Sequence, residues 1–140
     1  MVNVKGFSPR YTAPEVFGRL TANLTNASIE DEMKGDVYSY AVILWEMMAR
    51  KSPWANCMFF SFFLSHLIDF QNEKLKKNVV KEIDEINFQV QSGEREEIPN
   101  SNGDQNLELI SSLIELSWKQ IPDERPHFNH IDQKLSSLTC

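Results

Sequence analysis

The chain has 140 residues, of which 41% are hydrophobic, and its formal net charge at pH 7 is -6. A chain of this length forms one domain or part of one, and its apolar share is too high for a wholly disordered protein. The acidic balance provides no basic surface of the kind that binds nucleic acid, so we expect no nucleic-acid partner.

The two cysteines bear on the cellular compartment. Cys57 and Cys140 are too few for a disulfide framework, and they match no metal-ligand spacing. The N-terminus also lacks an apolar leader. Both features favour reduced thiols in a cytoplasmic protein.

The N-terminal part is expected to be mostly loop. Pro14 fits the first turn of a short helix that continues through Phe17, because the missing N–H of proline costs nothing there. Residues 18–33 are polar and rich in Asn, Thr, Ser and acidic residues, and they predict a long surface loop.

The segment 34–50 predicts a helix at the centre of the fold. Its apolar residues recur at the spacing of one helical face, and the opposite face is also apolar, as in a helix buried on all sides. Asp36 is expected to cap its N-terminus. The helix should stop near Pro53, because the residue before a proline disfavours helical dihedrals.

The segment 54–70 is rich in phenylalanine and strongly apolar, but it is too short to span a bilayer. We expect a helix packed on the core or on a partner. An interfacial membrane helix is the alternative, and it is less favoured because few basic residues flank the segment. We therefore expect no membrane association.

Three more helices are expected in the C-terminal half. Residues 79–91 are amphipathic, and Gly93 fits the position that ends such a helix. Residues 107–118 form a second apolar segment, and Asp123 can cap a last helix that carries Phe128. No segment alternates as a strand does, so the sequence predicts a mainly α fold of about five helices.

Four short segments, in the same order, carry a family resemblance. They read SPRYTAPE at 8–15, GDVYSYAVILWE at 35–46, SGEREEIP at 92–99 and SWKQIPDERPHF at 117–128. Together they resemble the C-terminal lobe of a eukaryotic protein kinase, most closely the tyrosine-kinase-like and tyrosine-kinase branch. The resemblance implies a kinase-like C-lobe built from the EF, F, G, H and I helices, with 34–50 as the F helix.

The resemblance implies structural roles for residues within these motifs. Glu15 matches the Glu of the Ala-Pro-Glu motif, which in the family pairs with the Arg before the last helix, here Arg125. A carboxylate against a guanidinium forms two charge-assisted hydrogen bonds, and we expect a buried pair. Asp36 matches a carboxylate that accepts backbone amides of the catalytic loop. Trp45 and Trp118 belong to the same structural framework.

The resemblance also implies a peptide-docking loop. Ser8 matches a hydroxyl that contacts the catalytic Asp and Lys, and the following residues match the loop that receives the substrate residue after the phosphorylated one. Glu46 matches an acidic position near the peptide site in some kinases, or it is a solvated helix residue. The expected substrate-binding residues are Ser8, Pro9, Arg10, Tyr11 and Thr12.

The sequence lacks the motifs of phosphoryl transfer. That reaction needs a Gly-rich loop over the phosphates, a Lys held by a Glu, and the catalytic-loop and metal-binding motifs. The five glycines form no such loop. We therefore expect no catalytic residue, cofactor or metal site in this chain, whereas ATP and Mg²⁺ are expected for a complete family member.

The domain organisation follows from the same comparison. Residues 1–140 are expected to be a partial kinase domain that begins inside the activation segment. Residues 55–77 exceed the short connection found in the family, so they are an insert or unspliced sequence that has been translated.

Three functions compete at this stage. The first is a fragment of a kinase that phosphorylates Ser or Thr of proteins, and Tyr less readily; the fragment itself, inactive alone, supplies the docking and structural half. The second is a non-catalytic interaction module or pseudokinase remnant. The third is an unrelated helical bundle. Protein or peptide substrates of the parent kinase are the expected partners.

Overall fold

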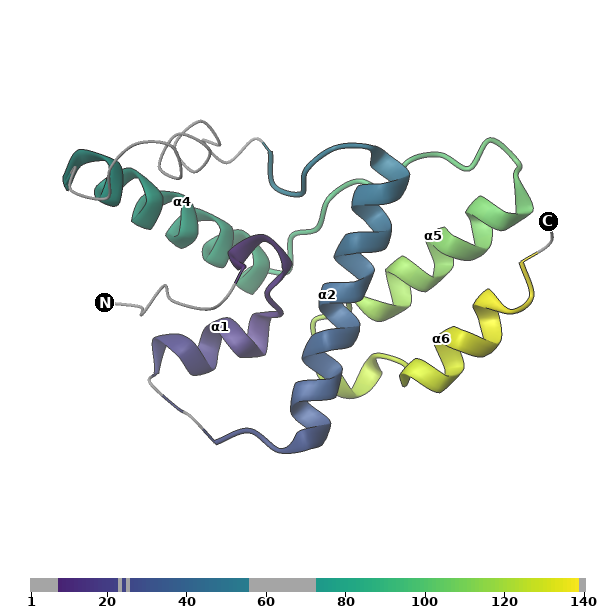
Figure 1. Cartoon of the computed structure of the whole chain (residues 1–140), viewed down its shortest axis with the longest axis horizontal. Helices are drawn as coiled ribbons and strands as arrows, with labels where there is room; N and C mark the ends of the chain where they lie inside the picture. The colour runs from purple at the N-terminus through teal and green to yellow at the C-terminus, as the bar shows by residue number, and fades with distance from the viewer. Residues whose placement is uncertain (1–7, 23, 25, 56–72, 139–140) are drawn as a thin grey trace.

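A computed structural model describes residues 8–22, 24, 26–55 and 73–138, with the side chains of 73–79 left out. Within these ranges the chain forms five α-helices and two short 3-10 turns and no strand (Figure 1). The elements in order are η1 (Pro9–Tyr11), α1 (Pro14–Thr21), α2 (Ile29–Ala49), α4 (Glu73–Gln91), α5 (Gln105–Ser117), η2 (Pro122–Glu124) and α6 (Phe128–Leu135). The prediction of a mainly α fold is confirmed.

The central position of α2 is also confirmed. It runs between α1 and α4 on one side and α5 and α6 on the other (Figure 1), and it contacts α5, η1 and η2. The main core surrounds it with buried aromatic and aliphatic side chains. Those from α2 are Tyr38, Ala41, Val42 and Trp45, and those from the other helices are Phe17, Ile83, Ile86, Val90 and Ile114. A smaller cluster of Val37, Leu113 and Ile131 joins α2, α5 and α6.

The predicted start of the central helix is wrong. The helix begins at Ile29, and Asp36 lies inside it with an exposed side chain. Ser28 is the cap: its hydroxyl accepts the Asp31 N–H at 3.1 Å, and the Asp31 carboxylate accepts the Ser28 N–H at 3.1 Å. This reciprocal capping box and the acidic residues of the first turn stabilise the N-terminus of the helix. The helix therefore begins before the first residue of the apolar pattern.

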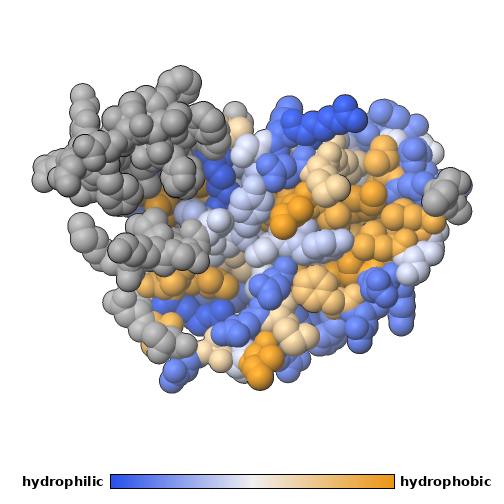
Figure 2. All heavy atoms as spheres, in the orientation of Figure 1, coloured by the Kyte–Doolittle hydropathy of each residue, from blue (hydrophilic) through white to orange (hydrophobic). Residues whose placement is uncertain are grey.

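The prediction that the central helix is buried on all sides is also wrong. Ile43 and Met47 are 43% and 71% exposed. They lie on one side of α2, at positions separated by four residues, which is about one helical turn. Figure 2 shows apolar side chains gathered on the half of the molecule where α2, α5 and α6 lie. The described elements therefore cover α2 only in part.

Two other boundaries differ from the predictions. Helix α1 continues past Phe17 to Thr21, so the loop before α2 is shorter than expected. Asp123 lies within η2 and does not cap the last helix, which begins at Phe128. Arg125 precedes a proline and has extended dihedrals, which separates η2 from α6.

Helix α4 ends at Gln91, as the sequence predicts. It is described from Glu73, which precedes the predicted start at residue 79. Gly93 has a φ of +87°, the left-handed conformation that glycine adopts after a helix. The helix is described from Glu73, so the last part of the expected insert, 73–77, is helical. The Phe-rich helix expected at 54–70 lies almost wholly outside the described residues, and the origin of 55–77 stays a prediction.

The helices of the described ranges include none that is long and apolar enough to cross a membrane.

The capping box of α2 predicts the effect of one substitution. Ser28→Ala removes the acceptor for the Asp31 N–H, so we expect it to lower the free energy of unfolding by about 1 kcal/mol. Urea denaturation followed by circular dichroism measures the change. Ser112→Ala, in the middle of α5, removes an exposed serine that caps nothing and is the matched control. An equal loss in both variants would contradict the assignment of Ser28 as the cap.

Candidate peptide-docking site

Residues 8–12, which we call the docking loop, fold into a tight turn held by its own bonds. The Tyr11 N–H donates to the Ser8 carbonyl at 3.0 Å, and the Thr12 hydroxyl donates to the same carbonyl at 2.8 Å. The Thr12 N–H donates to the carbonyl of Pro9, whose ring fits the first position of the turn. Ser8 itself is exposed. The loop is thus preformed, with its first residue open to solvent.

Tyr11 fixes the docking loop to the central helix. Its hydroxyl donates to Glu46 Oε2 at 2.7 Å, and its carbonyl accepts the Ser39 hydroxyl at 2.8 Å. Partial burial, the hydrogen bond to Glu46 and the charge of Glu46 raise the pKa of Tyr11 from 10.0 to about 12. The phenol therefore stays neutral and remains a donor throughout the physiological pH range.

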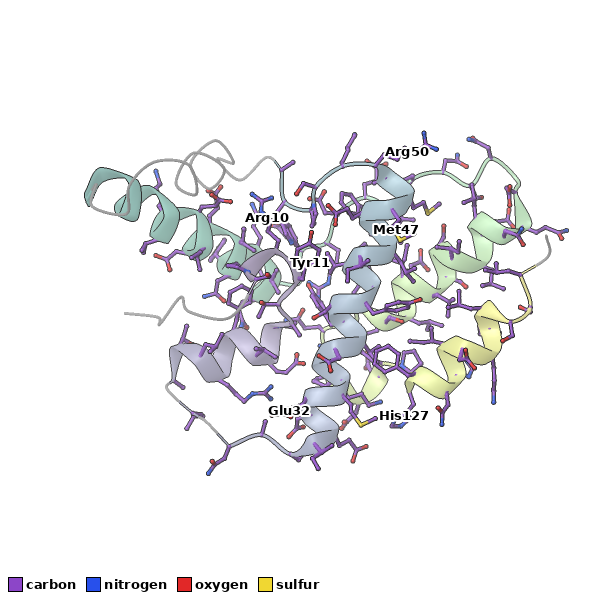
Figure 3. All side chains as sticks on the ribbon, in the orientation of Figure 1. Arg10, Tyr11, Glu32, Met47, Arg50 and His127 are labelled. Atoms are coloured by element: carbon purple, nitrogen blue, oxygen red, sulfur yellow. The ribbon has the colours of Figure 1, made fainter. Side chains whose placement is uncertain are left out.

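Arg10 fixes the other side of the docking loop to α4. Its Nη2 lies 2.5 Å from Glu82 Oε1, and its Nη1 donates to the Pro53 carbonyl. The two side chains are only 12% and 5% exposed. Figure 3 shows Arg10 and Tyr11 beside the upper part of α2. Two neighbouring residues of the loop thus contact different helices.

The ion pair expected between Glu15 and Arg125 is present. Both carboxylate oxygens of Glu15 accept from the guanidinium, each at 2.8 Å. The Arg125 side chain is fully buried, and that of Glu15 is 18% exposed. This bidentate geometry joins α1 to the segment before α6.

The remaining donors of Arg125 are also satisfied. Nε donates to the Lys119 carbonyl at 2.8 Å, Nη1 to the Lys34 carbonyl at 2.9 Å, and Nη2 to the Gln120 carbonyl at 3.4 Å. Lys34 in turn donates from Nζ to the Arg125 carbonyl at 2.5 Å. With the two bonds to Glu15, all five N–H groups of the guanidinium have an acceptor.

A glycine in α2 allows α1 to approach closely enough for this pair. A Cβ on Gly35 would lie 3.3 Å from a methyl carbon of Val16 and 3.7 Å from Glu15 Oε1. Glycine in a helix interior normally destabilises the helix by about 1 kcal/mol relative to alanine. Here the missing side chain leaves room for α1.

The ring of Tyr38 contacts two arginines. The guanidinium carbons of Arg95 and Arg125 are 5.1 Å and 5.2 Å from its ring centre. Arg95 Nε also donates to the Trp118 carbonyl at 2.9 Å. Burial raises the pKa of Tyr38, and burial lowers the pKa of Arg95. This cation–π arrangement ties the segment after α4 to the Glu15–Arg125 pair.

The other predicted structural residues differ in their surroundings. Trp45 is buried and donates from Nε1 to the Glu97 carbonyl at 2.9 Å. Trp118 is buried in the same core. The exposed Asp36 contacts no catalytic loop within the described residues, so its predicted role stays a prediction.

Three residues that carry these contacts were not singled out by the sequence: Lys34, Glu82 and Tyr38. Glu82 lies 72 positions from Arg10, and Lys34 lies 91 positions from Arg125. No local pattern reports pairs at such separations. The resemblance indicated the segment that contains Arg95, but not its stacking on Tyr38.

Two observations bear on the chemistry of the docking loop. No group of three or more His, Cys, Asp or Glu side chains in the described part of the chain could hold a metal ion. The side chains of Arg10, Tyr11 and Thr12 all bond within the protein. Of the five loop residues, Ser8 is exposed, Pro9, Arg10 and Tyr11 are partly buried, and Thr12 is buried.

The sequence of this chain is similar to those of known proteins. A sequence model of the family described as protein tyrosine and serine/threonine kinase matches residues 3–135. Receptor-interacting serine/threonine-protein kinase 2 of Bos taurus is 31% identical over 102 residues, 69% of this chain and 14% of the relative. Receptor-type guanylate cyclase gcy-28 of Caenorhabditis elegans is 30% identical over 133 residues, 91% of this chain and 9% of the relative.

Receptor-interacting serine/threonine-protein kinase 1 of Homo sapiens is 27% identical over 125 residues, 89% of this chain and 14% of the relative. This chain therefore spans 14% or less of the length of the relatives named here.

The buried ion pair predicts a large effect of Glu15→Gln. The glutamine removes the charge that balances the fully buried Arg125 guanidinium, so we expect the free energy of unfolding to fall by about 3 kcal/mol. Urea denaturation measures it. Glu124→Gln, which makes the same change at an exposed position next to Arg125 in the sequence, should change stability by less than about 0.5 kcal/mol. Similar losses in the two variants would show that the pair is not a major source of stability.

The bond from Tyr11 to Glu46 predicts a pH effect. Because the folded pKa of Tyr11 is raised above the unfolded value, its contribution to stability is complete below pH 10 and is lost as pH rises through about 12. Glu46→Gln should move the pKa of Tyr11 down toward 10. Phenolate absorbance during titration, with Tyr11→Phe to subtract the signals of Tyr38 and Tyr40, measures it. An unchanged pKa in Glu46→Gln, as in the exposed control Glu85→Gln, would refute the coupling.

Proposed function

Because the chain belongs to the protein tyrosine and serine/threonine kinase family, we propose that it supplies the peptide-docking and structural part of a protein kinase domain. In the complete domain, the γ-phosphate of ATP passes to a hydroxyl of a protein substrate while Mg²⁺ neutralises the developing charge. This chain holds the peptide, and the nucleotide, the metal ion and the catalytic groups belong to the rest of the domain.

The observation that carries the proposal is the way the docking loop is held. Arg10 binds α4, Tyr11 binds α2, and the neighbouring Pro14 carbonyl accepts from Gln91 Nε2 at 2.6 Å. Binding energy that would be lost in ordering a flexible loop is therefore kept for the peptide. The proposed docking residues are Ser8, Pro9, Arg10, Tyr11 and Thr12.

The exposed apolar side chains of α2 support the proposal that further parts of a kinase domain pack against this helix. Ile43 and Met47 lie on the central helix of the fold, where a large exposed apolar side chain is unfavourable. Covering them with further parts of the kinase domain would bury both. The small share of each relative that this chain spans agrees with such an arrangement.

The kinase group, the type of residue that is phosphorylated and the cellular location are part of the same proposal. Similarity to two receptor-interacting serine/threonine-protein kinases supports transfer to Ser or Thr. The motif resemblance supports the tyrosine-kinase-like group. A cytoplasmic location is supported by the two cysteines, which form no disulfide framework in the sequence.

A chimera tests the proposal. In receptor-interacting serine/threonine-protein kinase 2, this chain replaces the region that it matches, and Mg²⁺-dependent transfer of labelled phosphate to a Ser peptide is measured. We expect transfer above background, and its loss in a chimera with Arg125→Leu. The chimera with Glu124→Gln is the control and should keep its activity.

Two results would contradict the proposal. One is a chimera that folds and binds nucleotide but transfers no phosphate, which would favour a non-catalytic interaction module. The other is Mg²⁺-dependent phosphorylation by the 140-residue chain alone, because the proposal leaves the catalytic groups to the rest of the domain.

A further inference from the structure

The exposed side of α2 carries a stripe of residues with the spacing of a coiled coil. Its six positions are separated alternately by four and three residues, and all but one are apolar or aromatic. They are Ile29, Met33, Asp36, Tyr40, Ile43 and Met47. The four isoleucine and methionine side chains are between 42% and 79% exposed. Such a repeat, which we call the α2 stripe, forms the seam along which a second helix packs in a coiled coil.

The α2 stripe is long and open enough to receive a helix. Helix α2 has 21 residues and is therefore about 30 Å long. Figure 1 shows no described helix crossing in front of α2, and Figure 2 shows apolar side chains at the surface of the same part of the molecule. Near the middle of the stripe, the rings of Tyr40 and Phe128 are 5.9 Å apart, and Phe128 is itself 37% exposed. Phe128 thus widens the apolar surface at this point.

The two ends of α2 carry opposite charges. Its first turn contains Glu30, Asp31 and Glu32, and Arg50 and Lys51 follow its last turn. All five side chains are exposed. Figure 3 shows Glu32 near one end of the helix and Arg50 at the other. A second α2 that runs antiparallel therefore brings acidic residues to basic residues at both ends, whereas a parallel one would bring like charges together.

We propose that the α2 stripe is an interface between two copies of the 140-residue chain, which pair through antiparallel α2 helices about a two-fold axis. In the register that aligns the two stripes over their whole length, Met33 lies opposite the partner's Ile43. Asp36 lies opposite the partner's Tyr40, whose hydroxyl can donate to the carboxylate. The one charged member of the stripe thus gains a donor, and the stripe is complementary to itself.

The inference goes beyond the proposed docking function and does not depend on it. Further parts of a kinase domain that cover Ile43 and Met47 would occupy the same surface. The dimer and the complete domain therefore exclude each other, and pairing is a property of the 140-residue chain.

The oligomeric state of the 140-residue chain tests the interface. Analytical ultracentrifugation over a range of concentrations measures the dissociation constant of the dimer. We expect Met47→Glu to raise this constant at least about tenfold, because it places a charge in an apolar seam that faces the partner's acidic first turn. Phe88→Glu is the matched control: Phe88 is as exposed as Met47, 71%, but lies on α4, so the constant should not change.

Disulfide trapping tests the antiparallel register. In a chain that carries Cys57→Ser and Cys140→Ser, the substitutions Met33→Cys and Ile43→Cys are made separately. Each variant is oxidised alone and in a mixture with the other. Antiparallel pairing places the two positions opposite each other, so the mixture should form a covalent dimer and neither variant alone should do so.

Several results would overturn the inference. A monomer at every concentration is one, and a dimer that Met47→Glu leaves intact or that Phe88→Glu weakens equally is another. Covalent dimers of Met33→Cys with itself would show a parallel pair, which contradicts the proposed register. If Met47→Glu loses its helical circular dichroism, the trapping experiment decides, because its variants keep small uncharged side chains in the stripe, and absence of the mixed covalent dimer then overturns the inference. Phosphate transfer by the chimera tests the docking function separately.

Discussion

Arg125 is the side chain on which the described structure depends. It is fully buried, it binds Glu15 of α1 and the Lys34 carbonyl of α2, and it binds two carbonyls of its own segment. A buried guanidinium is tolerated only when its charge is balanced and its donors are bonded, and both conditions hold here. The arrangement of three distant segments is therefore set by one residue.

The position of the docking loop follows from this constraint. The loop immediately precedes α1, and α1 is held against α2 by Glu15 and by the space that Gly35 leaves. Arg10 and Tyr11 then add contacts to α4 and α2. Structure and binding are thus linked: groups that stabilise the helical core also order the surface proposed to receive a peptide.

Helix α2 differs from its sequence prediction at its start and in the exposure of its side chains. The helical periodicity of α2 is clear in the sequence but predicts too late a start, because the capping box of Ser28 and Asp31 lies in a polar, acidic segment that resembles a loop. The exposure of Ile43 and Met47 was not predicted either, since an apolar side chain looks the same in sequence whether or not a neighbour covers it.

The sequence by itself determined the helical content, the central helix, the kinase-like motifs and, through the resemblance, the pairing of Glu15 with Arg125. These follow from local spacing and from motifs whose residue types are set by their chemistry. Only the tertiary structure decided that Arg10 pairs with Glu82, that Tyr11 pairs with Glu46, and that Tyr38 contacts two arginines. These contacts join residues that become neighbours only when the helices pack, so no local pattern in the chain specifies them.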